Sequence, residues 1–393
     1  QKCFSKNYEN NNELHTLYQR KYLENKAIKK ILLIADTFFP EKNSAALMLF
    51  SLANHIHNEN IELLVVTPHQ NPKQKIKFLK EDGYNHLKFY CPFLKSNNLI
   101  LRTFGELFLS KIFIKNTKIT KNYFIDTNLI ISYSPTIFFG PYVKYLKKEF
   151  HINKSYLILR DIFPQWIVDL KLLSKVNPIY LIFKFFEKNL YFNSSKIGIQ
   201  SQNNFQYFNS QILKKKIEYL PNWYQNNLVS KKSDLFKNIN FKYKIIYTGK
   251  LSFAQNLKSF QFFLNLISQI PDTCFIYIGD SFNQIKNAHN IFSFSSVSQE
   301  QLQYLLNKSD LGVVNLDKQH STHNVPGKSL NYLANGLPII ASLNANNDFI
   351  ETINDNKIGY ATSLELHENK EIILEIKKIL ENYEEYSLNA IKY

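Results

Sequence analysis

Residues 31–47 decide the fold: they read Ile-Leu-Leu-Ile-Ala, then Asp-Thr-Phe-Phe-Pro-Glu-Lys-Asn, then Ser-Ala-Ala-Leu. The first five form a continuous apolar run, which is typical of a strand buried on both faces of a parallel sheet. A proline-containing loop covers 36–43, and a helical pattern then runs from 44 to about 57. Another apolar run follows at 61–67. This order predicts a βαβ unit, with its loop at the carboxyl end of the first strand, where open α/β sheets bind ligands.

The alternation of strand and helix patterns continues in two series along the chain. In the first series we expect strands at 87–90, 129–133 and 156–159. The second series follows Pro221 and a polar, lysine-rich linker at 225–242. Its expected elements are strands at 243–248, 274–278, 311–315 and 338–342 and helices at 256–270, 298–307 and 327–334. The fold class is therefore α/β, with two Rossmann-like, doubly wound domains facing a central cleft.

These patterns divide the chain into four expected parts. Residues 1–27 are polar and form an N-terminal extension. Residues 28–218 form the first Rossmann-like domain, and residues 219–369 form the second. Residues 370–393 begin with a charged amphipathic helix, and we expect this last part to cross back to the first domain.

Composition limits the classes of protein to which the chain can belong. It has 393 residues, of which 45% are hydrophobic and 20% charged, so neither a disordered chain nor a disulfide scaffold fits. Its three cysteines have no paired spacing, which indicates a reducing compartment. No apolar run reaches the length of about 18 residues that a membrane helix requires. Lysine and arginine exceed aspartate and glutamate by 48 − 32 = 16, and such an excess suits a polyanionic partner.

Nucleic acid, anionic lipid and a phosphorylated substrate could each explain this charge. The sequence contains no zinc-finger spacing and no aromatic ribonucleoprotein signature, so we expect no nucleic acid partner. Residues 99–115 and 178–192 are both apolar and basic. Each stretch is either a core helix with solvated lysines or an interfacial helix lying among anionic lipid headgroups. Coding bias of an AT-rich genome is a further explanation for part of the lysine content.

The richest motif is His323-Asn324-Val325-Pro326-Gly327-Lys328-Ser329, which precedes a strand at 338–342. Pro326 and Gly327 are suited to begin a helix, whose free amides and dipole would attract an anion, and Lys328 adds a full charge. Gly-Lys-Ser also occurs in nucleotide-triphosphate P-loops. That motif requires another glycine five residues before Gly327, where this chain has Thr322, so the P-loop interpretation is rejected.

With this segment, three shorter motifs resemble glycosyltransferase family 4, whose members have the GT-B fold. They are Tyr-Thr-Gly-Lys-Leu at 247–251, Ile-Gly-Asp at 278–280 and Leu-Pro-Asn at 220–222, and the resemblance spans about residues 29 to 383. A narrower resemblance is to bacterial N-acetyl-fucosamine transferases of surface-polysaccharide biosynthesis. It rests on residues 134–135, 160–166, 254–256 and 322–328.

The resemblance implies a retaining, metal-independent glycosyltransferase. It would move an N-acetylated deoxyhexose or hexosamine from a UDP-sugar to a lipid-linked saccharide in bacterial O-antigen or capsule synthesis. The second domain would bind this nucleotide sugar, without a further cofactor, and the first a polyprenyl-diphosphate-linked glycan. The protein would be cytoplasmic and peripheral on the inner face of the cytoplasmic membrane, against its anionic surface. A sugar-nucleotide epimerase of the same fold and a catalytically inactive GT-B subunit are the alternatives.

The resemblance also implies roles for individual residues. The expected donor-binding residues are Gly249, Lys250, Gln255, Asp280, Asn324, Pro326, Gly327, Lys328, Ser329 and Asn331. The family's two glutamates map onto His323 and Asn331, and its second diphosphate lysine maps onto Gln255. The expected acceptor-side residues are Asn43, Ser44 and Ser134.

Catalytic roles are expected for Asp161, Arg160 and His323. For Asp161 the alternative is a cap of the following turn. Arg160 would pair a phosphate bidentately or form an ordinary ion pair. We expect no metal site, because the sequence contains no Asp-x-Asp and the spacing of His320, His323 and Asp317 fits no zinc set.

Overall fold

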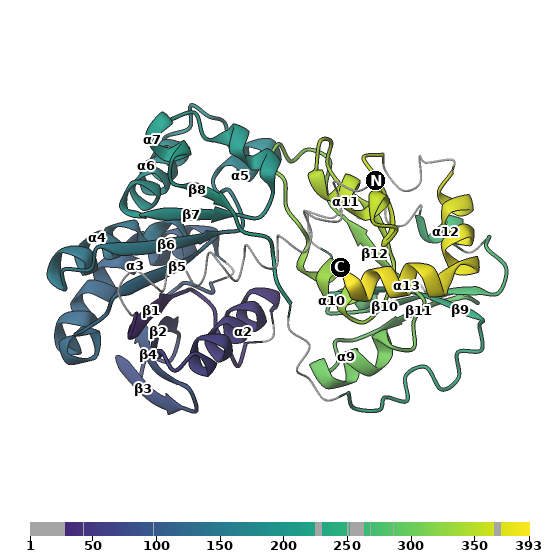
Figure 1. Ribbon diagram of the computed structural model, residues 1–393, viewed down its shortest axis with the longest axis horizontal. Coiled ribbons are helices and arrows are strands. Elements are labelled where there is room, and N and C mark those ends of the chain that lie inside the picture. The colour runs from purple at the N-terminus through teal and green to yellow at the C-terminus, as the bar shows by residue number, and fades with distance from the viewer. Residues whose placement is uncertain are drawn as a thin grey trace.

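The computed structural model describes residues 28–41, 43–96, 98–224, 230–249, 251, 263–267, 269–285, 287–364 and 371–393. They form two domains that lie side by side, each built on its own sheet (Figure 1). The expected α/β class with two Rossmann-like domains is therefore confirmed.

The first domain contains an eight-stranded sheet in the order β3-β4-β2-β1-β5-β6-β7-β8. All neighbouring strands are parallel except β3, which is antiparallel to β4. The strands are β1 (Lys30–Ile34), β2 (Glu62–His69), β3 (Ile76–Glu81), β4 (Tyr84–Tyr90), β5 (Leu129–Ser134), β6 (Lys154–Leu159), β7 (Lys196–Ile199) and β8 (Ile217–Tyr219).

Helices cover both faces of this sheet, as the apolar strands require. Strand β1 sends Ile31 and Leu33 to a core shared with α2 (Ser44–Asn58), and Leu32 and Ile34 to the core on the opposite face. The helices on that second face are α3 (Leu99–Ile119), α4 (Gly140–Glu149) and α6 (Pro178–Asn193). Shorter helices are α5 (Gln165–Asp169), α7 (Gln211–Lys214) and the 3-10 turns Lys121–Phe124, Ile137–Phe139 and Gln202–Tyr207.

The second domain contains a parallel six-stranded sheet in the order β11-β10-β9-β12-β13-β14. Its strands are β9 (Tyr243–Thr248), β10 (Thr273–Ile278), β11 (Ile291–Phe294), β12 (Leu311–Asn315), β13 (Ile339–Ser342) and β14 (Gly359–Thr362). Its helices are α9 (Gln299–Leu306), α10 (Gly327–Ala334), α11 (Asp348–Asp355), α12 (Ile372–Glu381), α13 (Tyr383–Lys392) and the 3-10 turn Phe282–Gln284.

Most expected elements are confirmed, and β9, β12 and α10 have the expected bounds. Of the helix expected at 256–270, residues 263–267 are helical and 252–262 lie outside the described residues. The sequence patterns missed β3, β7, β8, β11, β14, α4, α5, α7, α11 and α13. The missed strands are either short or, like β3, exposed and interrupted by lysines, so they lack the apolar run of a central strand.

The C-terminal part does not cross back to the first domain, so that expectation was wrong for residues 371–393. Ile372, Ile376 and Ile379 of α12 are buried in the core that covers one face of the second sheet. Helix α13 packs beside α10 in the same domain. Burying these side chains against their own sheet satisfies the apolar face that the sequence pattern revealed.

Candidate functional site

The carboxyl ends of the two sheets face each other, and polar side chains that follow the strands join the domains. Asn204 makes two hydrogen bonds to the backbone of His323. Its Nδ2 donates to the His323 carbonyl at 2.6 Å, and its Oδ1 accepts from the His323 amide at 2.8 Å. Asp348 accepts from Ser201 Oγ at 2.8 Å and from the Gln202 amide at 2.7 Å. We call these contacts, with those of Asn324 below, the interdomain seam.

Asn324 is the residue of this seam that holds Asp161. Its Nδ2 donates to Asp161 Oδ1 at 2.9 Å, and its Oδ1 accepts from Gln200 Nε2 at 2.9 Å. Burial raises the pKa of Asp161 above its ordinary value, although nearby Arg160 and this hydrogen bond act in the opposite direction. Asp161 thus lies where the domains meet, with its side chain bonded across their boundary.

Arg160 contacts the connection between the two domains. Its Nη1 donates to the Leu220 carbonyl at 2.8 Å, and its guanidinium lies 5.0 Å from the ring centre of Trp223. Only 5% of its surface is exposed, and burial lowers its pKa to about 10. Arg160 therefore anchors the connection between the domains, and its expected role at a phosphate stays a prediction.

His323 is also held by the protein itself. It is buried in the seam, and its Nδ1 lies 3.1 Å from Asn344 Nδ2. Burial lowers the pKa of His323, which favours a neutral imidazole. With Nδ1 accepting from the amide, the ring proton is assigned to Nε2.

Two helices begin at the same place, one from each domain. A Cβ built on Gly327, the first residue of α10, would come within 3.0 Å of the Ser44 Cβ, and Ser44 is the first residue of α2. The positive ends of both helix dipoles are therefore adjacent. Helix α10 has no side-chain cap, since its N-cap residue is Pro326, so amides of its first turn can donate hydrogen bonds to an anion.

Lys328 lies in the first turn of α10 with its ammonium group inside the domain. The residue keeps some exposed surface, but Nζ is buried and has no hydrogen-bond partner among the described residues. It lies 3.6 Å from the ring centre of Tyr247. Burial lowers the pKa of Lys328 to about 7. The neighbouring Ser329 Oγ is likewise buried without a partner in the described part of the chain. These two unsatisfied groups indicate a polar ligand.

The turn after β9 leaves space beside the beginning of α10. Gly249 has a φ of 98°, and a Cβ there would meet nothing within 4 Å. A Cβ on Gly279 would instead come within 2.4 Å of the Gly249 carbonyl, so glycine allows these two turns to approach. Asp280 is exposed and accepts a hydrogen bond from Ser296 Oγ. Of the expected donor-binding residues, Lys250 and Gln255 lie outside the described residues.

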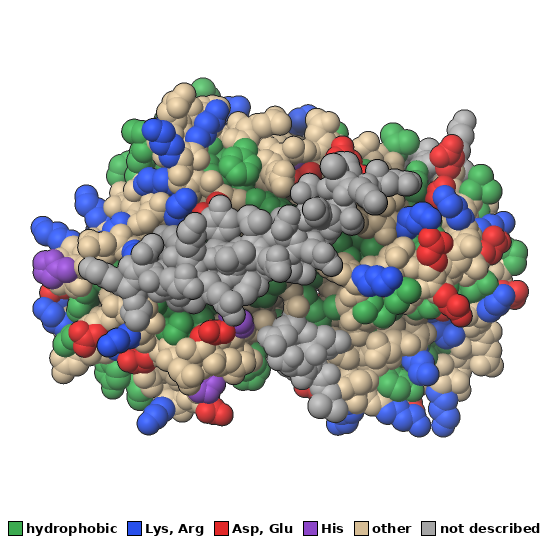
Figure 2. Space-filling view, viewed as in Figure 1, with side chains coloured by type: hydrophobic (Ala, Val, Ile, Leu, Met, Phe, Trp, Pro, Cys, Tyr) green, Lys and Arg blue, Asp and Glu red, His purple; other side chains and the backbone are tan. Residues whose placement is uncertain are grey.

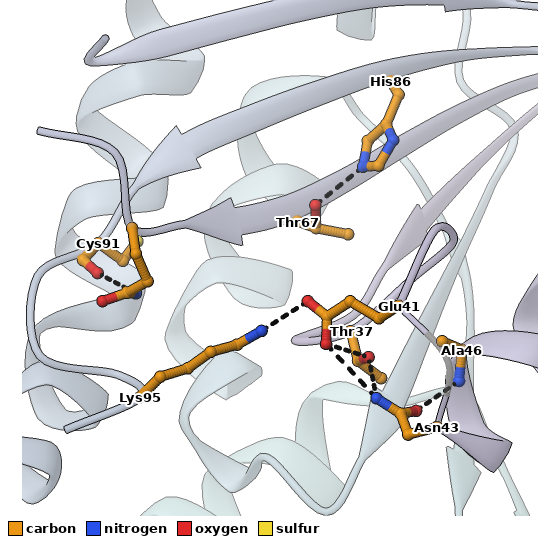
Figure 3. A network of polar contacts seen from close by, with 9 residues as sticks. Thr37, Glu41, Asn43, Ala46, Thr67, His86, Cys91 and Lys95 are labelled. Atoms are coloured by element: carbon orange, nitrogen blue, oxygen red, sulfur yellow. Dashed lines mark hydrogen bonds and ion pairs between the residues drawn. The ribbon is translucent and has the colours of Figure 1, made fainter. Parts of the chain in front are cut away.

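Two expected binding residues, Asn331 and Asn43, have hydrogen-bond partners within the protein. Asn331 Oδ1 accepts from Gln303 Nε2 at 3.2 Å and from Asn335 Nδ2 at 3.1 Å. Asn43 is the N-cap of α2: its Oδ1 accepts from the Ala46 amide at 2.8 Å, and its Nδ2 donates to Thr37 Oγ1 at 2.8 Å (Figure 3). The structure gives both side chains protein partners, whereas the sequence assigned them to ligands.

The sequence patterns did not single out Asp36, which lies two residues after the end of β1. Strand register pairs Ile34 with Ser132, so continuation of the two strands brings Asp36 beside Ser134. Asp36 Oδ2 accepts from Thr136 Oγ1 at 3.0 Å, whereas its Oδ1 and Ser134 Oγ are buried with no partner among the described residues. Burial raises the pKa of Asp36. A carboxylate placed directly after an apolar run was the signal that could have identified it.

Metal-binding side chains do not gather in the described ranges: no three or more His, Cys, Asp or Glu residues there are arranged to hold an ion. The site consists instead of helix N-termini, a buried lysine and hydroxyl and amide groups.

Comparison with solved structures identifies the fold. A sucrose-phosphate synthase from Thermosynechococcus elongatus is 13% identical and has a TM-score of 0.64, and the match covers 93% of each chain. The catalytic domain of starch synthase IV from Arabidopsis thaliana, bound to ADP and acarbose, is 9% identical with a TM-score of 0.64 over 92% of this chain and 94% of that one. The fold is GT-B. HepE from Anabaena, in complex with UDP and glucose, matches at 14% identity and a TM-score of 0.58, over 92% and 93%.

Sequence comparison adds no family assignment to the GT-B fold. No protein-family model matches the chain, and no curated protein sequence matches it. Membership of family 4 and of its fucosamine branch therefore stays a prediction, as do the individual residue roles.

Replacing Asn43 tests whether it acts as a helix cap. We expect Asn43→Ala to lower the free energy of unfolding by about 0.5–2 kcal/mol, because the first turn of α2 loses its acceptor. Asn43→Ser restores a capping oxygen and should recover at least half of the loss. Urea unfolding followed by circular dichroism measures both. Equal losses in the two variants would exclude the capping role.

Replacing Lys328 tests whether its buried ammonium destabilises the empty protein. Because the pKa is about 7 in the folded protein and about 10.4 in the unfolded chain, the unfolded chain binds more protons between these values. Stability from this group therefore rises with pH through that window. We expect Lys328→Met to raise the Tm at pH 6.5, and the difference to shrink by pH 9.5. Scanning calorimetry measures it, with exposed Lys308→Met as the control; a pH-independent difference would contradict the buried charge.

Proposed function

We propose that the protein is a glycosyltransferase that transfers a sugar from a nucleotide diphosphate donor to an acceptor bound by the first domain. The observation that carries this proposal is the meeting of the α2 and α10 N-termini, together with the Lys328 ammonium, which has no hydrogen-bond partner among the residues that the structure describes. A diphosphate supplies the negative charge that this arrangement lacks. The solved structures with UDP or ADP are of the same fold, which supports a nucleotide sugar as donor.

The donor's leaving diphosphate would be stabilised by Lys328 and by amides at the beginning of α10. Negative charge grows on the leaving phosphate as the sugar bond breaks, and preorganised donors directed at such charge often make the largest catalytic contribution. Lys328 is well suited to this task, because a bound diphosphate favours its protonated form. The family resemblance adds UDP as the nucleotide, an N-acetylated deoxyhexose or hexosamine as the sugar, and front-face transfer with retention of configuration, without a metal ion.

Asp36 and Ser134 would bind the acceptor. Their two unpartnered oxygens lie at neighbouring strand ends of the first sheet, at the edge that faces the second domain. A sugar hydroxyl can donate to the Asp36 carboxylate and exchange a hydrogen bond with Ser134. In this arrangement Asp36 orients the hydroxyl that attacks the donor sugar, while the leaving phosphate accepts its proton.

Two helices of the first domain expose apolar side chains that suit a membrane surface. Helix α3 exposes Ile100, Leu101, Phe104 and Phe108 beside Arg102, Lys111 and Lys115, and α6 exposes Ile179, Leu181, Ile182, Phe185 and Phe192. Green and blue side chains lie together over α6 and α7 at the upper left of Figure 2. Glu187 of α6 is only 1% exposed; it forms an ion pair with Lys184 and accepts a hydrogen bond from Tyr207 Oη at 2.6 Å.

The outer face of α6 is therefore mainly apolar, with Lys188 exposed on it, which suits the interfacial interpretation. None of the described helices is long and apolar enough to span a membrane. Peripheral attachment to the inner face of a bacterial cytoplasmic membrane, where polyprenyl-diphosphate-linked saccharides are extended into O-antigen or capsule, completes the proposal. The apolar faces and the lysines would contact the lipid and its anionic headgroups.

One assay separates the proposed activity from its alternatives. The protein is incubated with a panel of UDP-sugars, with and without a polyprenyl-diphosphate-linked saccharide, and each reaction is repeated with EDTA. Acceptor-dependent UDP release that survives EDTA supports a metal-independent transferase. Epimerised donor in the absence of acceptor would indicate an epimerase, and donor binding without turnover would indicate an inactive subunit.

Lys328 should couple UDP binding to proton uptake. At pH 8 the empty site holds mostly neutral lysine, because its pKa is about 7, and a bound diphosphate would recharge it. We expect UDP binding at pH 8 to take up a proton, seen in calorimetry as a binding enthalpy that varies with the buffer. Lys328→Met should weaken UDP binding at least tenfold, about 1.4 kcal/mol, and abolish the uptake. Lys308→Met should change neither, and unchanged affinity in Lys328→Met would remove this residue from the site.

Asp36 should affect the acceptor and not the donor. We expect Asp36→Asn to lower kcat/KM for the acceptor at least tenfold while the Kd for UDP stays the same, because the amide cannot accept as a carboxylate does. Since the pKa of Asp36 is raised, activity should fall on acidification at a pH above the ordinary aspartate range. The Asp36→Asn variant should lose this acidic limb of the pH–activity profile. Exposed Asp82→Asn is the control, and an equal loss of UDP affinity in Asp36→Asn would refute the assignment.

A further inference from the structure

A second cluster of positive charge lies on the first sheet, on the face that α2 covers. Its members are His69 of β2, Lys88 of β4 and Lys77 of β3, on three adjacent strands. Strand β4 pairs Tyr90 with His69 and Lys88 with Lys77. Alternation along β4 places Lys88 on the same face as His86 and Tyr84, which pack around Phe38. The three basic side chains therefore share one surface at the carboxyl ends of β2 and β4.

The positive charges in this cluster repel one another. Lys77 and Lys88 stand directly opposite in an antiparallel pair, an arrangement that destabilises a sheet when the charges are alike. Lys88 is half-buried, and its pKa is lowered first by burial and then by Lys77, with Lys95 contributing in the same direction. Glu41 and Glu81 raise it. Glu41 is already engaged, since Lys95 Nζ donates to its Oε1 at 2.7 Å (Figure 3).

His69 adds a hydrogen-bond donor without a partner. Its Nδ1 accepts from the Asn71 amide at 3.2 Å, which assigns the ring proton to Nε2. This Nε2 is buried and has no partner among the described residues. Its pKa is lowered by burial and by Lys88 and Lys77, so the ring is neutral and donates one hydrogen bond. Two opposed lysines and an N–H with no partner among the described residues together suit an anion with several acceptor oxygens.

We propose that His69, Lys77 and Lys88, with Lys95 at the rim, bind the diphosphate of the acceptor. The negative charge of a diphosphate offsets the charges of the two lysines. Its oxygens can also accept the hydrogen bond that His69 Nε2–H donates. Lys95 also lies just before helix α3, whose first turns expose Ile100, Leu101 and Phe104. A prenyl chain leaving the diphosphate can therefore contact apolar surface at once. The identity of this ligand as an acceptor rests on the proposed function, but the anion site itself does not.

Calorimetric titration with inorganic pyrophosphate and with geranyl diphosphate tests the site in the full-length protein. UDP is kept at saturation so that the donor site is filled. We expect one further diphosphate site per chain, with geranyl diphosphate binding more tightly than pyrophosphate. The double variant Lys77→Gln/Lys88→Gln should weaken both at least tenfold and leave the Kd for UDP unchanged. Its Tm should equal or exceed that of the wild type, because the opposed charges are gone.

The matched control is Lys73→Gln/Lys80→Gln, which removes the same charge from exposed positions of the same region. It should change diphosphate affinity less than twofold. Equal weakening by both double variants would reduce the cluster to general electrostatic attraction and overturn the proposal, as would the absence of a second diphosphate site. Vesicles with and without phosphatidylglycerol form the third arm: if the double variant loses vesicle binding but retains pyrophosphate binding, the lysines contact headgroups and the diphosphate site is refuted.

The two proposals can fail separately. Pyrophosphate binding that depends on Lys77 and Lys88, in a protein that transfers no sugar, would retain the anion site and reject the transferase. Sugar transfer with an acceptor KM that is unchanged in Lys77→Gln/Lys88→Gln would retain the transferase and reject this site.

Discussion

A buried ammonium group, that of Lys328, with no hydrogen-bond partner in the described part of the chain is the physical constraint on which the site depends. Removing a charged group from water is expensive unless another charge or several hydrogen bonds replace the water. Lys328 lies against Tyr247, and an aromatic face offsets only part of that loss. Without a bound anion, the lowered pKa of Lys328 lets the side chain lose its proton and become neutral near pH 7 and above. The same burial that destabilises the free ammonium strengthens its attraction to an anion, because little water remains to screen it.

The architecture explains why such a group can be placed between two domains. In parallel sheets the strands all end at one edge, and the helices that follow begin there. Two such edges face each other here, so the first residues of α2 and α10 come into contact. The seam that holds them consists mainly of amide groups, such as Asn204, Asn324 and Gln200, each bonded to a partner in the opposite domain. Neutral hydrogen bonds of this kind add little net stability individually, which is compatible with domains that rearrange when ligand binds.

The sequence predicted the parts of the fold that depend on local patterns. Continuous apolar runs identified the central strands, and Pro326-Gly327 identified the beginning of α10, because both signals are properties of consecutive residues. Strand β3 and helix α13 carried no comparable signal, since they depend on the neighbours against which they pack. The site was predicted only in part for the same reason. Lys328 was found from its motif, whereas the pairing of Asp36 with Ser134 depends on strand register, and Arg160 owes its place to the connection at Leu220.

The positive charge of the chain is best understood from where the individual lysines lie. An excess of 16 suggests a polyanion of any kind, but charge that is spread over a solvated surface is screened and selects little. Lys77 and Lys88 differ from that background because strand pairing fixes them opposite each other, so their repulsion persists in the folded protein. Lys328 differs because it is buried. In both places the fold maintains an unfavourable arrangement of charge that an anion would relieve, and in both an unsatisfied polar group, Ser329 or His69, lies nearby. Two such places, one in each domain, suit a reaction in which both substrates carry a diphosphate and only their sugars must meet.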